Sequence, residues 1–479
     1  MRVRLLHDPT CAEQVRLARR LSRSVDGVSF QLLGDQGTGA LPPSPPCDLI
    51  LHLKAMAPGG RPAPSEASAP LQAWLGGFRH GRVQPLSAAS GFAEVWHHDA
   101  ATALAIVSPG PDGGWLCQLH AEIPTQRHWR HNREQLIEAC ADYAALWLRH
   151  AGGWGLPRAR GRAVPCREIQ AAPPPGWRRP PLWCRHQLER IGLKLHHLTH
   201  RHAHWRIGWS GPGQPPLAPS RQIPAPASTW YADPFAWRDE TGHHWLLCEQ
   251  FEEDGARLGR IALFELPDGG PPLAHGTVLE EPFHLSFPRL VWIGGVPHLT
   301  VESASQQEVR LYEPCPFPRR WRLRRILLQG CTFIDPMLFQ HDDGLWYLLV
   351  STSSTAALRR EVAPELRLFH SPDPLTAPFR EHPSSPLLIS SRGGRNAGLL
   401  HRGGQWLRVA QRTGFGGIYG ESVALFRIVE LSPSSYREEP LATIPDGPSP
   451  GRLQRTLRAS HLHTLNEAGP LLVYDFIHG

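Results

Sequence analysis

The chain of 479 residues is long enough for two or three domains, and its 41% hydrophobic and 19% charged residues are typical of a globular protein. Its formal net charge of +7 comes almost entirely from scattered arginines, since lysine occurs only at Lys54 and Lys194, so we expect no nucleic-acid partner. No run of 18 apolar residues occurs and Asp8-Pro9 interrupts the first apolar run, so we predict no transmembrane segment, no signal peptide and a cytoplasmic location.

Residues 1–152 have the pattern of a small α/β domain. Short apolar runs predict strands, and one segment with apolar residues three and four apart predicts a helix before the second strand. The expected strands are residues 3–6, 28–33, 48–53, 91–96 and 102–107, and the expected helices are residues 11–24 and 132–148.

Residues 153–226 form a linker rich in proline, arginine and histidine. Apolar spacing predicts one helix at 183–197. The five histidines between His196 and His204 have no carboxylate at ligand spacing, and none of the nine cysteines forms a CxxC pair, so we expect neither a metal site nor a cofactor. The alternating segment Trp205 to Trp209 predicts a strand.

Residues 227–479 repeat one pattern of strand, turn and strand five times. Each copy opens on a polar residue and closes on another, 16, 16, 16, 15 and 12 residues later in chain order. Such repeats are typical of β-propeller blades, so we predict an all-β five-bladed propeller, with the strand at Trp205–Trp209 completing the last blade and closing the ring. The openers are Asp233, Ser286, Asp335, Asn396 and His463, and the closers include Glu249, Glu302, Gln411 and Asp475.

In a propeller, the first strand of every blade lines the central channel, so the openers are expected around one pocket. Asp before Pro is also a common way to enter a strand, and one such pair would carry little weight. Two pairs in register, with Glu249 and Glu302 at matching places, favour a functional site. Carboxylates gathered in one pocket can differ in pKa, which suits them to work on a glycosidic bond.

Several motifs of the second half resemble a known family. They include Trp230-Tyr-Ala-Asp-Pro-Phe, His284-Leu-Ser-Phe-Pro, Arg395-Asn-Ala-Gly, Tyr419-Gly420 and His463-Thr464. The resemblance is to the N-terminal propeller domain of plant glucosamine inositolphosphorylceramide transferases and its bacterial relatives, which is itself similar to arabinanase and xylosidase propellers. In the plant proteins, sugar transfer is attributed to a separate C-terminal domain.

The resemblance implies that Asp233 is the base, Glu302 the acid and Asp335 the carboxylate that tunes them. The order differs from the hydrolases, which place the tuning Asp in blade two and the acid in blade three. Residues 1–152 resemble a degenerate formyltransferase-like domain, although the Asn-x-His element is not found and a formyltransferase activity ranks last.

The first functional hypothesis is therefore an enzyme that transfers or hydrolyses a glycosyl group during glycan biosynthesis or remodelling. Its ligand would be a saccharide or nucleotide sugar, and partner enzymes of glycan biosynthesis are expected. The residues expected to bind the substrate are Glu249, His284, Ser286, Arg395, Asn396, Gln411 and His463. The alternative is a non-catalytic propeller that binds a sugar and recruits it to a partner enzyme.

Overall fold

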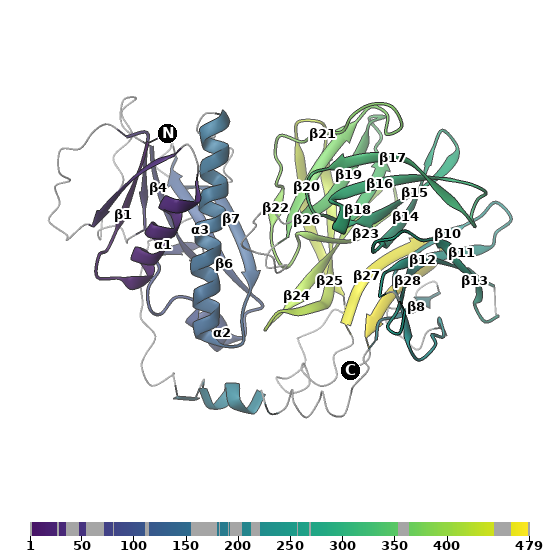
Figure 1. Ribbon diagram of the computed structural model, residues 1–479, viewed down its shortest axis with the longest axis horizontal. Coiled ribbons are helices and arrows are strands. Elements are labelled where there is room, and N and C mark those ends of the chain that lie inside the picture. Colours follow the sequence, from purple (N-terminus) through teal and green to yellow (C-terminus); the bar gives the residue numbers. More distant parts are fainter. Residues whose placement is uncertain are drawn as a thin grey trace. The chain divides into compact units, whose positions relative to one another are not determined.

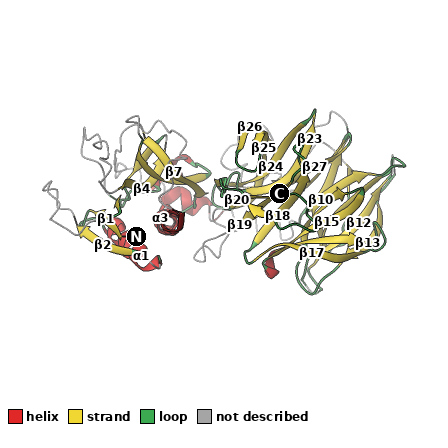
Figure 2. Cartoon of the chain, turned by 90° about the horizontal axis from the view of Figure 1, so that it is seen from above, coloured by secondary structure: helices red, strands yellow, loops and turns green. Residues whose placement is uncertain are grey.

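The computed structural model describes residues 2–25, 28–34, 47–53, 71–79, 81–110, 115–154, 180–181, 183–189, 191, 204–211, 221–255, 257–267, 270–352, 364–444 and 461–477. The chain divides into two compact units, one built mainly from residues 1–190 and the other mainly from residues 191–479. Helices α1 and α3 belong to the first unit, and the described part of the second is built of strands with one short 3-10 helix, η2 (Ala304–Gln306) (Figure 2).

The first unit contains a mixed sheet of seven strands in the order β2-β1-β3-β4-β6-β7, with β5 paired to β4 (Figure 1). The strands β1 to β4 run parallel, and β6 is antiparallel to β4. The elements are β1 (Arg2–His7), α1 (Ala12–Ser24), β2 (Ser29–Gly34), β3 (Leu49–His52), β4 (Leu71–Arg79), β5 (Arg82–Gln84), α2 (Phe92–His97), β6 (Ala101–Pro109), β7 (Trp115–Pro124) and α3 (Trp129–Trp154). An α/β arrangement is therefore present, as the apolar runs predict.

The strand predicted at residues 91–96 is wrong, because this segment forms helix α2. Gly91 and His98 flank it in the left-handed conformation, with φ of 74° and 58°. Phe92 and Val95 are both buried, and their spacing of three residues is that of one helix face. The six-residue run at 91–96 was too short to distinguish the two-residue period of a strand from the 3.6-residue period of a helix.

The second unit is a five-bladed propeller, which confirms the prediction from the repeat. Each blade is an antiparallel sheet. Blade one holds β10 (Thr229–Arg238), β11 (His244–Glu252), β12 (Arg260–Leu266) and β13 (Leu273–Leu279). Blade two holds β14 (Ser286–Ile293), β15 (Val296–Ser303), β16 (Glu308–Pro314) and β17 (Trp321–Gln329). Blade three holds β18 (Phe333–Gln340), β19 (Trp346–Thr352), β20 (Glu365–Ser371), β21 (Arg380–Glu381) and β22 (Leu388–Ile389).

The last two blades complete the ring. Blade four holds β23 (Arg395–Arg402), β24 (Gln405–Gly414), β25 (Ile418–Leu431) and β26 (Tyr436–Ile444). Blade five combines β27 (His461–Ala468) and β28 (Leu471–Ile477) with two strands from before blade one, β8 (Arg206–Ser210) and β9 (Arg221–Gln222). Val473 pairs with Trp209 in this closing sheet. First strands contact their neighbours around the ring, and β27 contacts β10.

Apolar residues from facing sheets fill the space between adjacent blades. Leu247 and Leu263 of blade one pack with Leu299 and Tyr312 of blade two, and all four are buried. Four further clusters occupy the other blade interfaces in the same way. Burial on both faces explains why the inner strands read as continuous apolar runs rather than as alternating ones.

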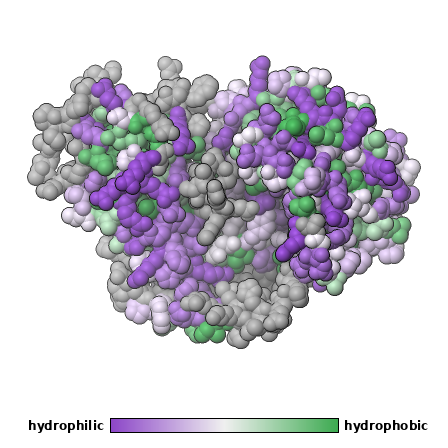
Figure 3. All heavy atoms as spheres, viewed as in Figure 1, coloured by the Kyte–Doolittle hydropathy of each residue, from purple (hydrophilic) through white to green (hydrophobic). Residues whose placement is uncertain are grey.

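The exposed side chains of the described residues are mixed in character. On the face drawn in Figure 3, hydrophilic residues cover much of the propeller and hydrophobic ones are scattered among them. Among the helices in the described ranges, none has both the length and the apolar content needed to cross a membrane.

Candidate functional site

The first strand of every blade is interrupted at the same place. Register shifts occur between Ala232 and Phe235 in β10, and at matching positions in β14, β18, β23 and β27. A β-bulge of this kind bends the strand and redirects the bulged side chain. The repeat therefore places one bulge per blade around the channel.

Three of the bulges force an unfavourable backbone conformation. Asp233, Phe287 and Asp335 have φ of 52°, 49° and 49°, in the left-handed region that non-glycine residues avoid. Each is followed by proline. The surrounding hydrogen bonds must hold these residues in place, and such strain is concentrated at functional sites.

The bulges correct two positions in the sequence alignment of the repeat. Ser286 pairs with Glu302 just as Ala232 pairs with Glu249, so Phe287, rather than Ser286, occupies the position of Asp233 in blade two. Ser286 is buried beside the bulge and was misplaced by one residue.

In blade five, Leu462 pairs with Phe476, so Phe476 takes the position of Glu249 and Asp475 lies one residue earlier. The placements of Asp233, Asp335, Asn396 and His463 as openers agree with the register.

Buried polar side chains join each blade to the next at this end of the channel. The Glu302 Oε2 accepts a hydrogen bond of 2.9 Å from the Asp335 amide, and Asp475 Oδ2 accepts one of 2.8 Å from the Asp233 amide. Asp233 Oδ2 in turn accepts one of 3.3 Å from the Phe287 amide. These bonds satisfy the amides that the bulges expose, so part of the role of these carboxyls is structural.

Asp335 is also paired with a cation. Its Oδ2 lies 2.6 Å from Arg395 Nε, and the Asp335 side chain is fully buried. The Arg395 guanidinium lies over the Tyr419 ring, 4.9 Å from the ring centroid. Asn396 Nδ2 donates to the Asp335 carbonyl at 3.0 Å. Arg395, which the sequence predicts to bind the substrate, is therefore already paired with Asp335.

His463 links blade five to blade one. Its Nδ1 lies 3.0 Å from Asp475 Oδ2 and 3.4 Å from Asp233 Oδ1, and its Nε2 lies 2.5 Å from the Tyr419 hydroxyl. The ring of Trp205 lies against the imidazole with centroids 4.6 Å apart. Asp475 and Trp205 are part of this group, although the repeat pattern identified Asp475 only as a closer and Trp205 only as part of the ring-closing strand. The sequence did contain a signal for Asp475, because it is an acidic residue inside the otherwise apolar strand β28.

Glu249 makes a separate pair with His284. The Gly259 amide donates to His284 Nδ1 at 2.9 Å, so the proton of a neutral ring sits on Nε2, which lies 3.2 Å from Glu249 Oε1. The nearby carboxylate raises the pKa of His284.

Burial raises the pKa of two of the three candidate catalytic carboxyls. The pKa of Asp233 lies well above its usual range, because of burial first and the nearby Asp475 second. Burial, followed by the charge of Asp335, raises the pKa of Glu302 to about 8. Glu302 is therefore expected to hold a proton at neutral pH while it lies beside the ion-paired Asp335.

Two amide side chains carry buried acceptors that receive no hydrogen bond from the described residues. Gln411 Nε2 donates to the Asn396 carbonyl at 3.0 Å, and the Asn396 amide nitrogen is also engaged, so both side-chain orientations are set. Asn396 Oδ1 and Gln411 Oε1 are buried and accept no hydrogen bond within the described residues. Buried acceptors without donors are costly, and ligand hydroxyls would satisfy them.

A metal ion is one further occupant to test. One ligand atom each from Asp233, His463 and Asp475 lie within 4.8 Å of one another. The hydrogen bonds of both His463 nitrogens already account for this cluster. We therefore assign no step to a metal.

The propeller matches a known protein family. A family model described as glucosamine inositolphosphorylceramide transferase 1, N-terminal, matches residues 219–466, which is more than half of the chain. The chain belongs to this family. The match lies in the propeller and leaves the first unit outside it.

Two plant relatives carry the same description in their names. Glucosamine inositolphosphorylceramide transferase 1 of Oryza sativa subsp. japonica is 32% identical over 218 residues, which are 45% of this chain and 28% of that protein. The protein of the same name from Arabidopsis thaliana is 29% identical over 167 residues, or 34% of this chain and 21% of that protein. The match therefore spans less than a third of either relative.

Solved structures with distant similarity include two glycoside hydrolases. One is Zg3597, a family 117 enzyme of Zobellia galactanivorans, with 11% identity and a TM-score of 0.38 over 57% of this chain and 90% of that one. Another is an exo-1,5-α-L-arabinanase from a bovine ruminal metagenomic library, with 12% identity and a TM-score of 0.34 over 44% of this chain and 77% of that one. Similarities this low carry no functional conclusion. None of these matches supports the formyltransferase-like resemblance of residues 1–152.

Proposed function

We propose that the propeller is a carbohydrate-active domain that binds a saccharide at the Asp233 end of its channel and acts on a glycosidic bond. The observation that carries this proposal is the contrast between Glu302 and Asp335. Glu302 has a pKa raised to about 8, whereas Asp335 is ion-paired with Arg395. A carboxyl that keeps its proton at neutral pH, beside a carboxylate whose charge raises its pKa, can act as the general acid of glycosyl transfer or hydrolysis.

In this mechanism Glu302 donates its proton to the oxygen of the leaving group. Because its pKa is raised, Asp233 must first release its own proton to solvent. The resulting carboxylate removes a proton from the attacking hydroxyl or water, and the raised pKa makes it a stronger base for that step. Asp335 is ion-paired with Arg395, and its charge helps to raise the pKa of Glu302. The free oxygens of Asn396 and Gln411 accept hydrogen bonds from sugar hydroxyls.

Biosynthesis or remodelling of a glycan is the proposed setting, as the names of the plant relatives suggest. We propose a nucleotide sugar or a saccharide as ligand, a cytoplasmic location and partner enzymes of glycan biosynthesis as predictions still to be tested.

The test is to incubate the full chain with a panel of nucleotide sugars and aryl glycosides and to score transfer and hydrolysis by mass spectrometry. Asp233→Asn should abolish turnover while the fold persists. Asp342→Asn, in the exposed turn of blade three, is the matched control and should leave turnover unchanged. Equal product from wild type and Asp233→Asn would refute the catalytic role.

A non-catalytic sugar-binding module is the second candidate. It is favoured by the hydrogen bonds through which Glu302 and Asp475 hold the bulges of neighbouring blades, since these bonds give the carboxyls a purpose without catalysis. This alternative predicts saccharide binding with no turnover of any panel member, and binding that survives Asp233→Asn.

A further inference from the structure

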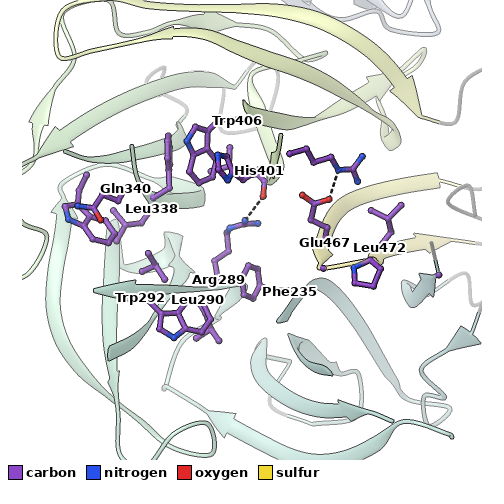
Figure 4. Close-up of a pocket in the computed structure, with 18 residues that line it drawn as sticks. Phe235, Arg289, Leu290, Trp292, Leu338, Gln340, His401, Trp406, Glu467 and Leu472 are labelled. Atoms are coloured by element: carbon purple, nitrogen blue, oxygen red, sulfur yellow. Dashed lines mark hydrogen bonds and ion pairs between the residues drawn. The ribbon is translucent and has the colours of Figure 1, made fainter. Parts of the chain in front are cut away.

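A second pocket lies at the opposite end of the propeller channel (Figure 4). The candidate site is at the start of the first strands, and this pocket is lined by residues near their far ends, together with the starts of β19 and β24. Its volume is about 870 Å³. That volume is enough for a ligand of sugar or nucleotide size.

A buried guanidinium without a counter-charge points into this pocket. Arg289 is only 8% exposed and lies among the labelled residues at the centre of Figure 4. Its partners are neutral: Asn466 Oδ1 at 2.5 Å and the Leu399 carbonyl at 3.4 Å, with the Phe235 ring centroid 5.0 Å away. Within the described residues it forms no ion pair, unlike the buried Arg408, which pairs with Glu438.

An uncompensated buried charge is expensive, because transfer of the ion out of water is not repaid by a nearby carboxylate. Burial lowers the pKa of Arg289 to about 9, so it remains charged at neutral pH. A functional explanation is that an anionic ligand supplies the missing charge.

A second donor in the same pocket also lacks an acceptor. Trp406 Nε1 is buried and donates no hydrogen bond within the described residues. Its ring lies against His401, with centroids 4.4 Å apart, and Trp292 and Trp346 form other parts of the wall. Such flat apolar faces suit the C–H face of a sugar ring, and the polar rim, which includes Gln340 and Glu467, suits hydroxyls.

We propose that this pocket binds an acidic saccharide, a sugar carrying a phosphate or a carboxylate, with the oxyanion on Arg289 and Trp406 Nε1. Arg289 presents paired N–H groups that match either oxyanion. The site uses neither Asp233, Glu302 nor Asp335 and does not depend on the proposed chemistry at the other end of the channel.

Calorimetric titration of the full chain with glucose, glucose 6-phosphate and glucuronate tests this proposal. Wild type should bind at least one acidic sugar about tenfold or more tightly than glucose, as expected for a charge-assisted hydrogen bond. The two acidic arms distinguish phosphate from carboxylate. Arg289→Gln should remove the preference, and Arg289→Lys should keep part of it. Arg322→Gln, in an exposed ion pair with Glu313, is the control and should bind as wild type does.

Trp406→Phe provides a second variant, because it keeps an aromatic ring at this position and removes the unpaired N–H together with the pyrrole part of the indole. It should weaken acidic-sugar binding several-fold, whether or not Arg289→Gln folds. Circular dichroism melts establish that each variant is folded. Absence of binding by every probe, equal affinity for glucose and both acidic sugars, or an unaltered preference in folded Arg289→Gln would each overturn the proposal.

Discussion

Arg395 Nε lies 2.6 Å from Asp335 Oδ2, so that an ion pair joins the first strands of blades three and four beside the candidate acid Glu302. Asp335 is fully buried, so bulk solvent would screen its charge only weakly if the cation were removed. The pair therefore serves the stability of the ring and the electrostatics of the site together.

Arg395→Gln should lower the free energy of unfolding by about 3 kcal/mol, because it leaves a buried carboxylate without its cation. Urea denaturation measures the change. Arg427→Gln is the matched control, since Arg427 pairs with Glu439 on the surface with side chains 37% and 44% exposed. That change should cost much less, because exposed ion pairs contribute little to stability. Equal losses in the two variants would contradict a buried, stabilising pair.

Glu302→Gln should flatten the dependence of stability on pH. The pKa of Glu302 is raised to about 8 in the folded chain from an ordinary 4.5, so the folded state binds more protons than the unfolded state between these values. Wild-type stability should therefore fall as pH rises from about 5 to 8, by ~1 kcal/mol or more. Thermal melts of both proteins across this range make the comparison, and parallel curves would argue against a protonated Glu302.

His284 should titrate above its ordinary pKa of 6.5, because Glu249 lies 3.2 Å away and favours the imidazolium. The stabilisation from this pair should be complete below pH 6.5 and disappear as pH rises through the higher folded pKa. NMR titration of the ring protons reports the value directly. Glu249→Gln should lower it, while Glu253→Gln, on an exposed turn, should not. An unchanged His284 titration in Glu249→Gln would exclude this cause.

Gly208→Val should destabilise the ring closure. A Cβ at Gly208 would lie 3.0 Å from the rings of both Phe476 and Tyr474, in the sheet that joins β8 to β28. Overpacking of this kind costs about 1–3 kcal/mol. At Gly211 a Cβ would meet none of the described residues within 4 Å, so Gly211→Val is the control. Denaturant midpoints that shift equally for both variants would show that β8 does not pack as described.

The amino-acid sequence by itself was enough to predict the propeller, because each blade of this fold repeats the same pattern of strands and turns. Five strand pairs at similar spacing predicted five blades, and the isolated alternating segment at Trp205–Trp209 pairs with β28 as the closing strand should. Apolar periodicity also predicted helices α1 and α3. The openers Asp233 and Asp335 could be found because proline follows both, which marks the bulge.

Only the tertiary structure decided which side chains share a site. A bulge changes register by one residue, and one residue moves a strand side chain to the opposite face. In blade two, the position that corresponds to Asp233 is therefore Phe287 and not Ser286. Asp475, which the repeat pattern identified as a closing residue, accepts the hydrogen bond from the Asp233 amide. The unpaired charge of Arg289 depends on which residues surround it in space, and no local pattern records that. Sequence determined the blades through periodicity, and packing around the ring decided the chemistry between them.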